Sequence, residues 1–277
     1  METFTIRKEG RLLDALVACG LTRTRAKSLL KHGAVKLNGR AVSRFDESAA
    51  AGDRVGISRG AALPPVIRGA APRLVHEDAH LLVVEKPAGL LSVATEKEKE
   101  KTLHFWLNAY LRPRRERVFI IHRLDREASG LMVFAKDEPT KRALQADWDR
   151  AVKRYWALVE GVPREEKGDL KSALRENSAK RVFVAARGGH PAHTRYRLVR
   201  RMGRHSLVDV ELFTGRKHQI RVHLADAGHP IAGDSKYGAV SDPAGRLALH
   251  AYFLSFVHPA TGERVRFETP PPPFAEV

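Results

Sequence analysis

The chain has 277 residues, enough for one large domain or for a large domain with a small companion. Hydrophobic residues make up 43% of it, which provides material for a core, and no apolar run approaches the ~18 residues that a membrane helix needs. The opening METFTIRKEG has no apolar signal segment, and the single cysteine, Cys19, excludes an intramolecular disulfide and a cysteine-rich metal site, so we expect a cytoplasmic protein.

The net charge is strongly positive. Lys and Arg number 49 against 32 Asp and Glu, a formal charge of +17, and the isoelectric point is near 10.3. Such a charge attracts polyanions, and nucleic acids bind it through phosphate contacts with release of counterions. The alternative is a proteome rich in arginine, in which every isoelectric point is high. The charge favours a nucleic-acid partner over that alternative.

Residues 11–59 have the pattern of a small unit of helices and a β-hairpin. Thr22 or Thr24 begins a second helix that runs to about His32. Two short apolar strands then flank Asn38-Gly39, a dipeptide typical of a tight hairpin turn, and GDRVGIS (52–58) adds a turn and a strand. The first helix is predicted from four apolar residues on one face, Leu12, Leu13, Leu16 and Val17.

The second helix is basic. Four of its residues and one just beyond it are candidate RNA-binding positions: Arg23, Arg25, Lys27, Lys31 and Lys36. A solvated charged face is the usual explanation. The helix has no acidic residue for pairing within itself, however, and a surface facing phosphates fits better.

The stretch RLLDALVACGLTRTRAKSLLKHGAVKLNGR (11–40), with the later GD–V step, resembles the alpha-L RNA-binding module first seen in a small-subunit ribosomal protein. The resemblance implies RNA binding without chemistry, and we assign residues 1–59 to this module. Residues 60–72 are then predicted as a linker, because small residues and prolines replace any apolar period.

Residues 73–277 are predicted as one large domain. Many strands, few interspersed helices and no regular alternation of the two indicate a mixed, mainly antiparallel α+β fold. A charged loop is expected at 95–101, and PPPPF (270–274) is expected to cover the domain surface. Strands are predicted at 81–85, 118–122, 131–136, 154–160, 193–200 and 206–213, and helices at 102–111, 138–151 and 216–227.

Two polar segments are candidates for chemistry. In FIIHRLDREASGLMVFAK (119–136), apolar strands flank a loop in which a carboxylate lies between arginines, as a nucleophile or base requires. From this loop alone, an ordinary arginine–aspartate turn is the commoner explanation. The second segment, GRKHQIRVHLADAGHPIAGDSKYG (215–238), carries Arg216, Lys217 and Arg221, which could meet phosphate or a buried carboxylate.

No cofactor or metal is expected. The histidines of 215–238 lack the H-x-x-x-H and H-E-x-x-H spacings of metal sites. No phosphate-binding loop or dinucleotide fingerprint follows a strand, so nucleotide cofactors have no support either.

Long segments across residues 73–270 resemble the Rlu-type pseudouridine synthases, which modify ribosomal and transfer RNA. The resemblance implies a cofactor-free isomerase that converts uridine to pseudouridine in structured RNA, ribosomal RNA being favoured over transfer RNA. A small basic module is a common companion in that family, and we expect a monomer. The matching segments are EKPAGLLSV (85–93), HRLDREASGLMVFAK (122–136), KRYWALVEG (153–161), GRKHQIRVHLADAGHPIAGDSKYG (215–238) and LALHAYFLSF (247–256).

Carried over by position, the resemblance assigns the catalytic aspartate to Asp125 and the active-site tyrosine to Tyr155. Arg221 is the arginine that pairs with the carboxylate, and we expect the two to form a close, buried salt bridge. One departure is Ala128, where threonine is usual. The remaining assignments are His122, Arg123 and Leu249 to the substrate, and Arg216 and Lys217 to RNA together with the five cations of the module.

In the implied mechanism the target uridine flips out of its stack, and Asp125 attacks the anomeric carbon or removes a proton from the neighbouring carbon. The freed uracil rotates and its carbon five bonds to the sugar. Tyr155 packs against the base, and removal of the last proton by this residue requires a lowered pKa or a relay. Two alternatives remain: an RNA-binding or ribosome-assembly protein without activity, and a glycosidase, which ordinarily uses two carboxylates.

Overall fold

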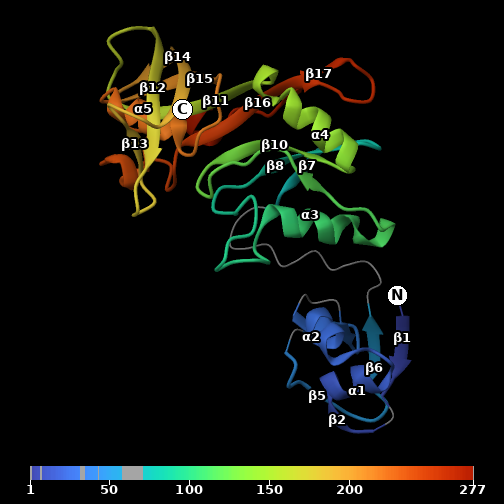
Figure 1. The fold of residues 1–277 in the computed structure, drawn as a ribbon. Coiled ribbons are helices and arrows are strands. Elements are labelled where there is room, and N and C mark those ends of the chain that lie inside the picture. The colour runs from blue at the N-terminus through green and yellow to red at the C-terminus, as the bar shows by residue number, and fades with distance from the viewer. Residues whose placement is uncertain (1, 7, 32–34, 43, 58–70, 277) are drawn as a thin grey trace. The chain divides into compact units, whose positions relative to one another are not determined.

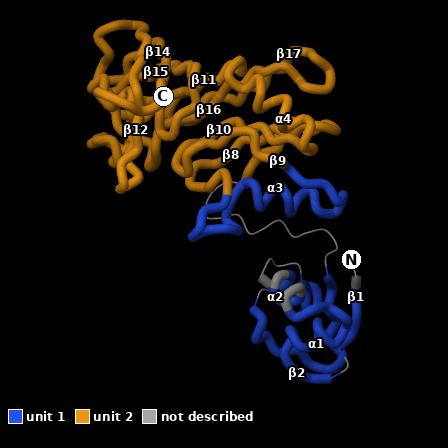
Figure 2. Tube along the Cα trace, viewed as in Figure 1, with its two compact units in different colours: residues 1–68, 94–118 blue, residues 69–93, 119–277 orange. Residues whose placement is uncertain are grey.

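The computed structural model describes residues 2–6, 8–31, 35–42, 44–57 and 71–276. The chain divides into two compact units, residues 1–68 with 94–118 and residues 69–93 with 119–277 (Figure 2). Residues 60–70 of the expected linker lie outside the described residues. The expected domain boundaries stay a prediction, and the assignment of 94–118 differs from them, since these residues group with the first unit.

The N-terminal part of the first unit has two helices and a small antiparallel sheet. Helix α1 spans Leu12–Ala18 and α2 spans Arg23–Lys31, close to the predicted ranges. Leu12, Leu13 and Leu16 are buried, as the predicted helical face requires. The sheet order is β1-β6-β3-β4, with β1 at Glu2–Thr5, β6 at Arg54–Ile57, β3 at Val35–Leu37 and β4 at Arg40–Val42; β2 (Gly10–Arg11) pairs with β5 (Ser48–Ala49).

The predicted hairpin turn is confirmed. Asn38 and Gly39 both have positive φ, 51° and 85°, as a two-residue turn between twisted antiparallel strands requires. The Asn38 side chain adds a local anchor, because its Oδ1 accepts from the Arg54 N–H at 2.8 Å and its Nδ2 donates to Asp53 at 2.8 Å. This dipeptide therefore ties the hairpin to the start of β6.

The other part of the first unit contains α3, Leu103–Leu111. The Thr102 side chain caps it by accepting from the Phe105 N–H at 3.1 Å. Leu103, Leu107 and Leu111 lie four residues apart on one face and are fully buried. A short 3₁₀ helix, η1 (Arg112–Arg114), follows.

Within the described residues of the second unit, eleven strands form one sheet (Figure 1). The path is β13-β12-β14-β15-β11-β16-β10-β8-β7, with β17 paired to β16 and β9 to β10. All its pairings are antiparallel except that of β10 with β16, which confirms the mixed, mainly antiparallel α+β class. The strands are β7 (Arg73–Glu77), β8 (Leu81–Lys86), β9 (Phe119–Ile120), β10 (Ser129–Ala135), β11 (Val152–Glu160), β12 (Lys167–Glu176), β13 (Val182–Val184), β14 (His190–Met202), β15 (His205–Leu212), β16 (Leu249–Val257) and β17 (Arg264–Glu268).

Two helices of this unit are shorter than predicted. Helix α4 (Glu138–Ala146) begins at its Asp137 cap and is followed by a 3₁₀ turn, η2 (Trp148–Arg150). Helix α5 (Gln219–Asp226) begins late because His218 has a φ of 53°, which a helix excludes. Figure 1 shows α5 beside β12 to β14 at one end of the unit and α4 with β17 toward the other.

The C-terminal segment ends in α6 (Pro273–Glu276), where Phe274 and Ala275 are buried and Arg200 donates to the Ala275 carbonyl at 2.8 Å. This agrees with the expected covering role of PPPPF. A third short 3₁₀ helix, η3 (Ser235–Tyr237), follows α5. Among the described residues, no helix is both long and apolar enough to span a bilayer.

The parallel contact between β10 and β16 is short. Only Ser129 with His250 and Gly130 with Ala251 pair before the strands separate. Gly130 has a φ of 117°, and a Cβ there would lie 2.2 Å from the Ala251 carbonyl oxygen. A residue without a side chain therefore allows the two backbones to meet. The polar loop of residues 121–128 enters β10 at this point.

Candidate active site

The polar loop that precedes β10 is held by the EKPAGLLSV segment. The Lys86 side chain is fully buried, and its Nζ donates to the carbonyls of Pro87, Leu90, Arg126 and Ala128 at 2.6–3.3 Å. Burial lowers the pKa of Lys86 to about 7, although the charge of Asp125 opposes the shift. Lys86 thus fixes the loop backbone, including the carbonyl of Ala128, where the family hydroxyl is missing.

Ser92 adds a second anchor from the same segment. Its hydroxyl donates to the Leu124 carbonyl at 2.7 Å, and the Leu124 N–H donates back at 3.1 Å. Sequence reasoning assigned no role to Lys86 or Ser92. The one signal was that both lie in a segment resembling the family.

Asp125 and Arg221 meet across 96 residues of sequence, as predicted. The Asp125 side chain is 17% exposed, and its Oδ2 accepts from Arg221 Nη1 at 3.3 Å. Arg221 lies in the first turn of α5 and is only 5% exposed. The carboxylate therefore faces an open space on one side and a buried guanidinium on the other.

The stronger partner of Arg221 is Asp234, which the sequence reasoning missed. Arg221 Nε donates to Asp234 Oδ2 at 2.7 Å and Nη2 to Oδ1 at 2.8 Å, a two-point contact with a carboxylate that is 1% exposed. Burial works against the charge on Arg221, but Asp234 and then Asp125 raise its pKa overall. Asp234 thus fixes the Arg221 guanidinium group, whose remaining nitrogen, Nη1, faces Asp125.

His218 is a second neighbour of Asp125. Its Nε2 is 3.9 Å from Asp125 Oδ1, and its Nδ1 is 2.7 Å from the Tyr237 hydroxyl. Burial lowers the pKa of His218, although the charge of Asp125 opposes the shift. Tyr237 also lies under the Arg221 guanidinium, whose central carbon is 5.2 Å from the ring centre. His218 and Tyr237 are further site residues that motif reasoning did not assign.

Tyr155 and Leu249 come from neighbouring strands of the sheet. In β11, Lys153 and Tyr155 are buried whereas Val152, Arg154 and Trp156 are partly exposed, which is the two-residue period of a strand. Leu249 begins β16 and pairs with Ala157 in the register. Burial, followed by the charge of Asp125, raises the pKa of Tyr155. The phenol therefore stays protonated at neutral pH, contrary to the lowered pKa that a base role requires.

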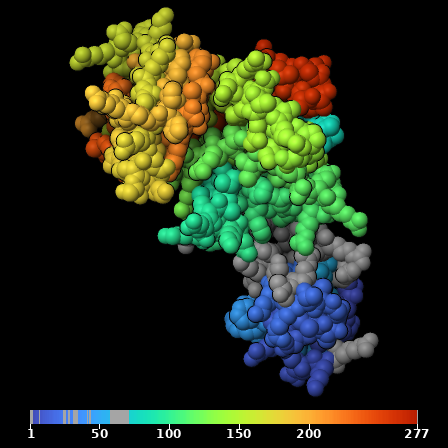
Figure 3. Space-filling model, in the orientation of Figure 1, coloured from blue at the N-terminus to red at the C-terminus, as the bar shows by residue number. Residues whose placement is uncertain are grey.

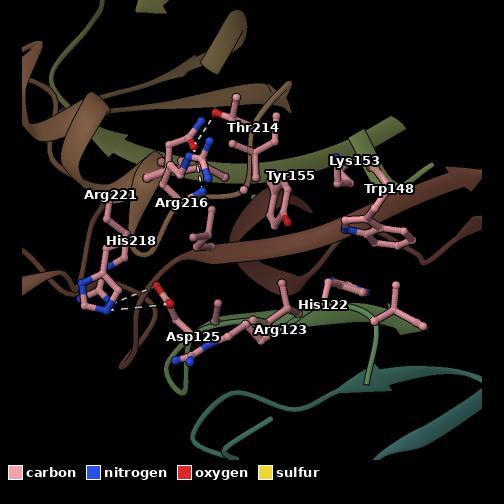
Figure 4. A pocket seen from close by; sticks show the side chains of 18 of the residues that line it. His122, Arg123, Asp125, Trp148, Lys153, Tyr155, Thr214, Arg216, His218 and Arg221 are labelled. Carbon is pink, nitrogen blue, oxygen red and sulfur yellow. Dashed lines mark hydrogen bonds and ion pairs between the residues drawn. The ribbon is translucent and has the colours of Figure 1, made fainter. Parts of the chain in front are cut away.

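These residues surround a cavity of about 360 Å³. Figure 4 shows Asp125, His218 and Arg221 toward one end and Trp148 toward the other, with the Tyr155 hydroxyl pointing into the space between. Figure 3 shows a hollow in the surface of this unit between the green residues near 119–150 and the orange residues near β15. Its lining includes every predicted catalytic and substrate-contacting residue: His122, Arg123, Asp125, Tyr155, Arg221 and Leu249.

The two cations predicted at the start of α5 differ in surroundings. Arg216 is exposed, lines the cavity and donates from Nε to the Pro191 carbonyl at 3.1 Å. Lys217 instead pairs with Glu176 at 2.5 Å, an exposed carboxylate. Arg123 is exposed and lines the cavity. Of the three, Arg123 and Arg216 are placed to meet a phosphate at the cavity mouth.

The module cations lie in the first unit. Lys27 and Lys36 are exposed. Arg23 is exposed too, and it reaches Asp14 of α1 at 3.4 Å, an acidic partner from outside its own helix. The side chains of Arg25 and Lys31 lie outside the described residues.

Comparisons with known proteins point to one family. The RNA pseudouridylate synthase family profile matches residues 80–226. A ribosomal large subunit pseudouridine synthase D of Neisseria meningitidis is 36% identical over 98% of this chain and 78% of its own length. An uncharacterised RNA pseudouridine synthase of Bacillus subtilis is 38% identical over 72% of this chain and 68% of its own. The structure of human RNA pseudouridylate synthase domain containing 4 superposes with a TM-score of 0.62 and 25% identity, over 74% of this chain and 90% of that one. The chain therefore belongs to the RNA pseudouridylate synthase family and is an isomerase of uridine in RNA.

Proposed function

We propose that this enzyme converts particular uridines of structured RNA to pseudouridine with Asp125 as its catalytic carboxylate. One observation carries the proposal: the Asp125 carboxylate faces the cavity while Arg221, itself fixed by Asp234, holds it from behind. A carboxylate that is oriented and open on one side is suited to attack a sugar carbon or to remove a proton from one. Ribosomal RNA is the favoured target, because the Neisseria relative is named for the large ribosomal subunit, and transfer RNA is the second.

The cavity is suited to a nucleotide that has left its stack. Flipping a uridine costs a few kcal/mol, which contacts in the site must offset. Leu249 and Tyr155 supply an apolar and an aromatic wall, and Asp125 lies beside them. Asp125 then acts at the anomeric carbon or its neighbour, the glycosidic bond breaks, and the rotated uracil bonds to the anomeric carbon through its carbon five as any bond to Asp125 breaks. Carbon five then gives up its proton and the former glycosidic nitrogen takes one up, so the product is an isomer of the substrate. Because the phenol of Tyr155 is protonated, we assign it to packing against the base and not to direct proton removal.

The test is to incubate the protein with ribosomal RNA from a strain lacking its gene and to map the pseudouridines formed. New pseudouridine supports the proposal, free uracil indicates a glycosidase, and no change indicates a protein that only binds RNA. Asp125→Asn keeps the size of the side chain but removes the nucleophile or base, so we expect turnover to vanish while RNA affinity changes little. Glu127→Gln, a neighbouring carboxylate that is 53% exposed, is the control. Retention of a tenth or more of the activity by Asp125→Asn contradicts the assignment.

A further inference from the structure

The cavity continues beyond the residues that the proposed chemistry uses. Past Tyr155, on the side away from Asp125 and Arg221, its walls come from His122, Trp148, Asp149 and Lys153 (Figure 4). We call His122, Trp148 and Lys153 the flanking subsite. Lys153 and Tyr155 are two residues apart on the same face of β11, so their backbones are about 7 Å apart, which is comparable to the length of one nucleotide.

Lys153 is a buried cation with unused donors. It is 6% exposed, and its Nζ donates to the Trp148 carbonyl at 3.0 Å. An ammonium group has three N–H donors, and in the described part of the chain the bond to Trp148 is the one hydrogen bond that Nζ makes. Burial lowers the pKa of Lys153, with Asp149 opposing the shift. Asp149 supplies a nearby negative charge but forms no direct ion pair with Lys153 among the described residues, so the burial of the ammonium still costs free energy, which an anion in the cavity would offset.

The wall beside Lys153 is aromatic, and Asp149 is its acidic member. The Trp148 ring stacks on His122 with 4.6 Å between ring centres, and Lys153 Nζ lies 5.7 Å from the Trp148 ring centre. His122 Nε2 accepts from the Val133 N–H at 3.2 Å, and burial, followed by the charge of Lys153, lowers the pKa of His122 to about 3. His122 is therefore not a cation of this wall, and Lys153 is the basic side chain that remains there. One cation next to aromatic rings is the donor set that a nucleotide needs for its phosphate and its base.

We propose that the flanking subsite binds the nucleotide adjacent to the target uridine, with Lys153 on the phosphodiester and Trp148 against the sugar or base. This inference rests on the proposed function, because it requires a uridine beside Asp125. A uridine that flips into the cavity draws its own phosphodiesters toward the cavity wall. The phosphodiester that reaches the interior needs a charge-assisted partner, and Lys153 has the position, the charge and the free donors.

The first test compares Lys153→Met with Lys153→Arg in single-turnover reactions on a ribosomal RNA fragment that the wild type modifies. We expect Lys153→Met to weaken RNA binding about tenfold, the cost of one charged hydrogen bond, and to lower the saturated rate much less. Lys153→Arg should recover part of the affinity. Lys141→Met is the matched control, because Lys141 pairs with Glu138 on α4 outside the cavity. A fall in the saturated rate with unchanged affinity overturns the inference, as does an equal effect of Lys141→Met.

The second test removes the charge of single phosphodiesters in the RNA. Methylphosphonate linkages replace, one at a time, the two phosphodiesters that flank the target uridine. The wild type should lose about tenfold in affinity at one of these positions, and Lys153→Met should lose nothing further there, since each change removes the same contact. Additive losses at both positions, or a wild type insensitive at both, overturn the inference. If Lys153→Met unfolds at a lower temperature than the wild type, the affinities of the wild type for the modified RNAs are sufficient to test the inference. Pseudouridine formation by the wild type is measured before either test. If the wild type forms none in any RNA, the proposed function itself is wrong, and not only this inference.

Discussion

At the scale of single residues, the site depends on a guanidinium shared between two carboxylates. Asp234 takes two of the Arg221 nitrogens, and Asp125 takes the third at a longer distance. The short pair fixes the guanidinium plane, and the long contact leaves Asp125 accessible to a ligand. Asp234 is thus a positioning residue: it never faces the substrate, but it determines where the positive charge behind Asp125 lies.

We therefore expect Asp234→Asn to lower the saturated rate of pseudouridine formation by about 10- to 100-fold, because a loosened Arg221 misplaces Asp125 by a fraction of an ångström or more. RNA affinity should change only a few-fold. Stability should fall as well, by about 3–5 kcal/mol, since a buried arginine loses its counter-charge. Single-turnover rates measured well below the melting transition separate the two effects.

Glu127→Gln is the comparison for this prediction. Glu127 also lies near Arg221, at 3.5 Å, but it is 53% exposed and makes no two-point contact. Solvent screens its charge, so its removal should change the rate by less than about threefold. If the two variants lower the rate equally, any negative charge near Arg221 is sufficient and the buried two-point contact with Asp234 has no special role.

At the scale of elements, the crossing of β10 and β16 brings the site together. The loop with Asp125 ends where β10 begins, and Leu249 begins β16 on the other side of the same contact. β11 then pairs with β16 and contributes Tyr155, beside a bulge in the register between Arg154 and Tyr155. Side chains at or next to three strands from distant parts of the chain thus line one cavity. The close approach of β10 and β16 at Gly130 makes this possible.

Gly130→Ala should destabilise the domain by about 3 kcal/mol or more, because the added Cβ overlaps the Ala251 backbone and its φ of 117° strains any side chain. Gly262→Ala is the control, since Gly262 has a φ of 72° with nothing within 4 Å of an added Cβ, and should cost about 1 kcal/mol. Denaturant unfolding of both variants measures the difference. Equal losses of unfolding free energy would mean that backbone strain at the glycine explains the whole effect and that β10 and β16 can move apart without destabilising the domain.

The elements that could be predicted are those that a short stretch of sequence encodes by itself. The Asn38-Gly39 turn and the apolar run of β8 depend on neighbours in sequence, and both were predicted. Strand β12 was not, because KGDLKSALRE exposes most of its polar side chains and has no apolar period that a buried face would impose. β16 was noticed as a family segment but not as a strand.

For the site, resemblance gave Asp125, Tyr155 and Arg221, whereas the physical surroundings needed the structure. The contact of Arg221 with Asp234 depends on the loop after α5 turning back toward the helix, which no period or spacing encodes. Burial of Tyr155 likewise raises its pKa, which is the opposite of the lowered pKa that direct proton removal needs and leaves the relay as the remaining route. Positions could be carried over from a family, but protonation states depend on the tertiary environment.

At the scale of the whole molecule, the charge is distributed over both parts of the sequence. Twelve Lys and Arg oppose six Asp and Glu in residues 1–60, so six of the seventeen excess positive charges lie in the expected module. Contacts with phosphates position an RNA without reading its bases. A module that contributes such contacts should therefore change affinity and salt dependence while leaving the chemical step in the large domain unaffected.

The last prediction tests the module through its described, exposed cations. A triple variant, Arg23→Gln with Lys27→Gln and Lys36→Gln, should bind RNA more weakly and with a flatter dependence on salt. The contact of Arg23 with Asp14 is 3.4 Å long and lies between exposed groups, so a phosphate can replace it. Each lost phosphate contact lowers the slope of log affinity against log salt by about 0.7–0.9, and the saturated rate should stay within a few-fold of the wild type. Arg40→Gln with Arg44→Gln is the matched control, because Glu47 and Asp46 already neutralise these two exposed arginines within the same module. If the triple variant keeps the affinity and slope of the wild type but melts at a lower temperature, the basic helix stabilises the protein and does not bind RNA.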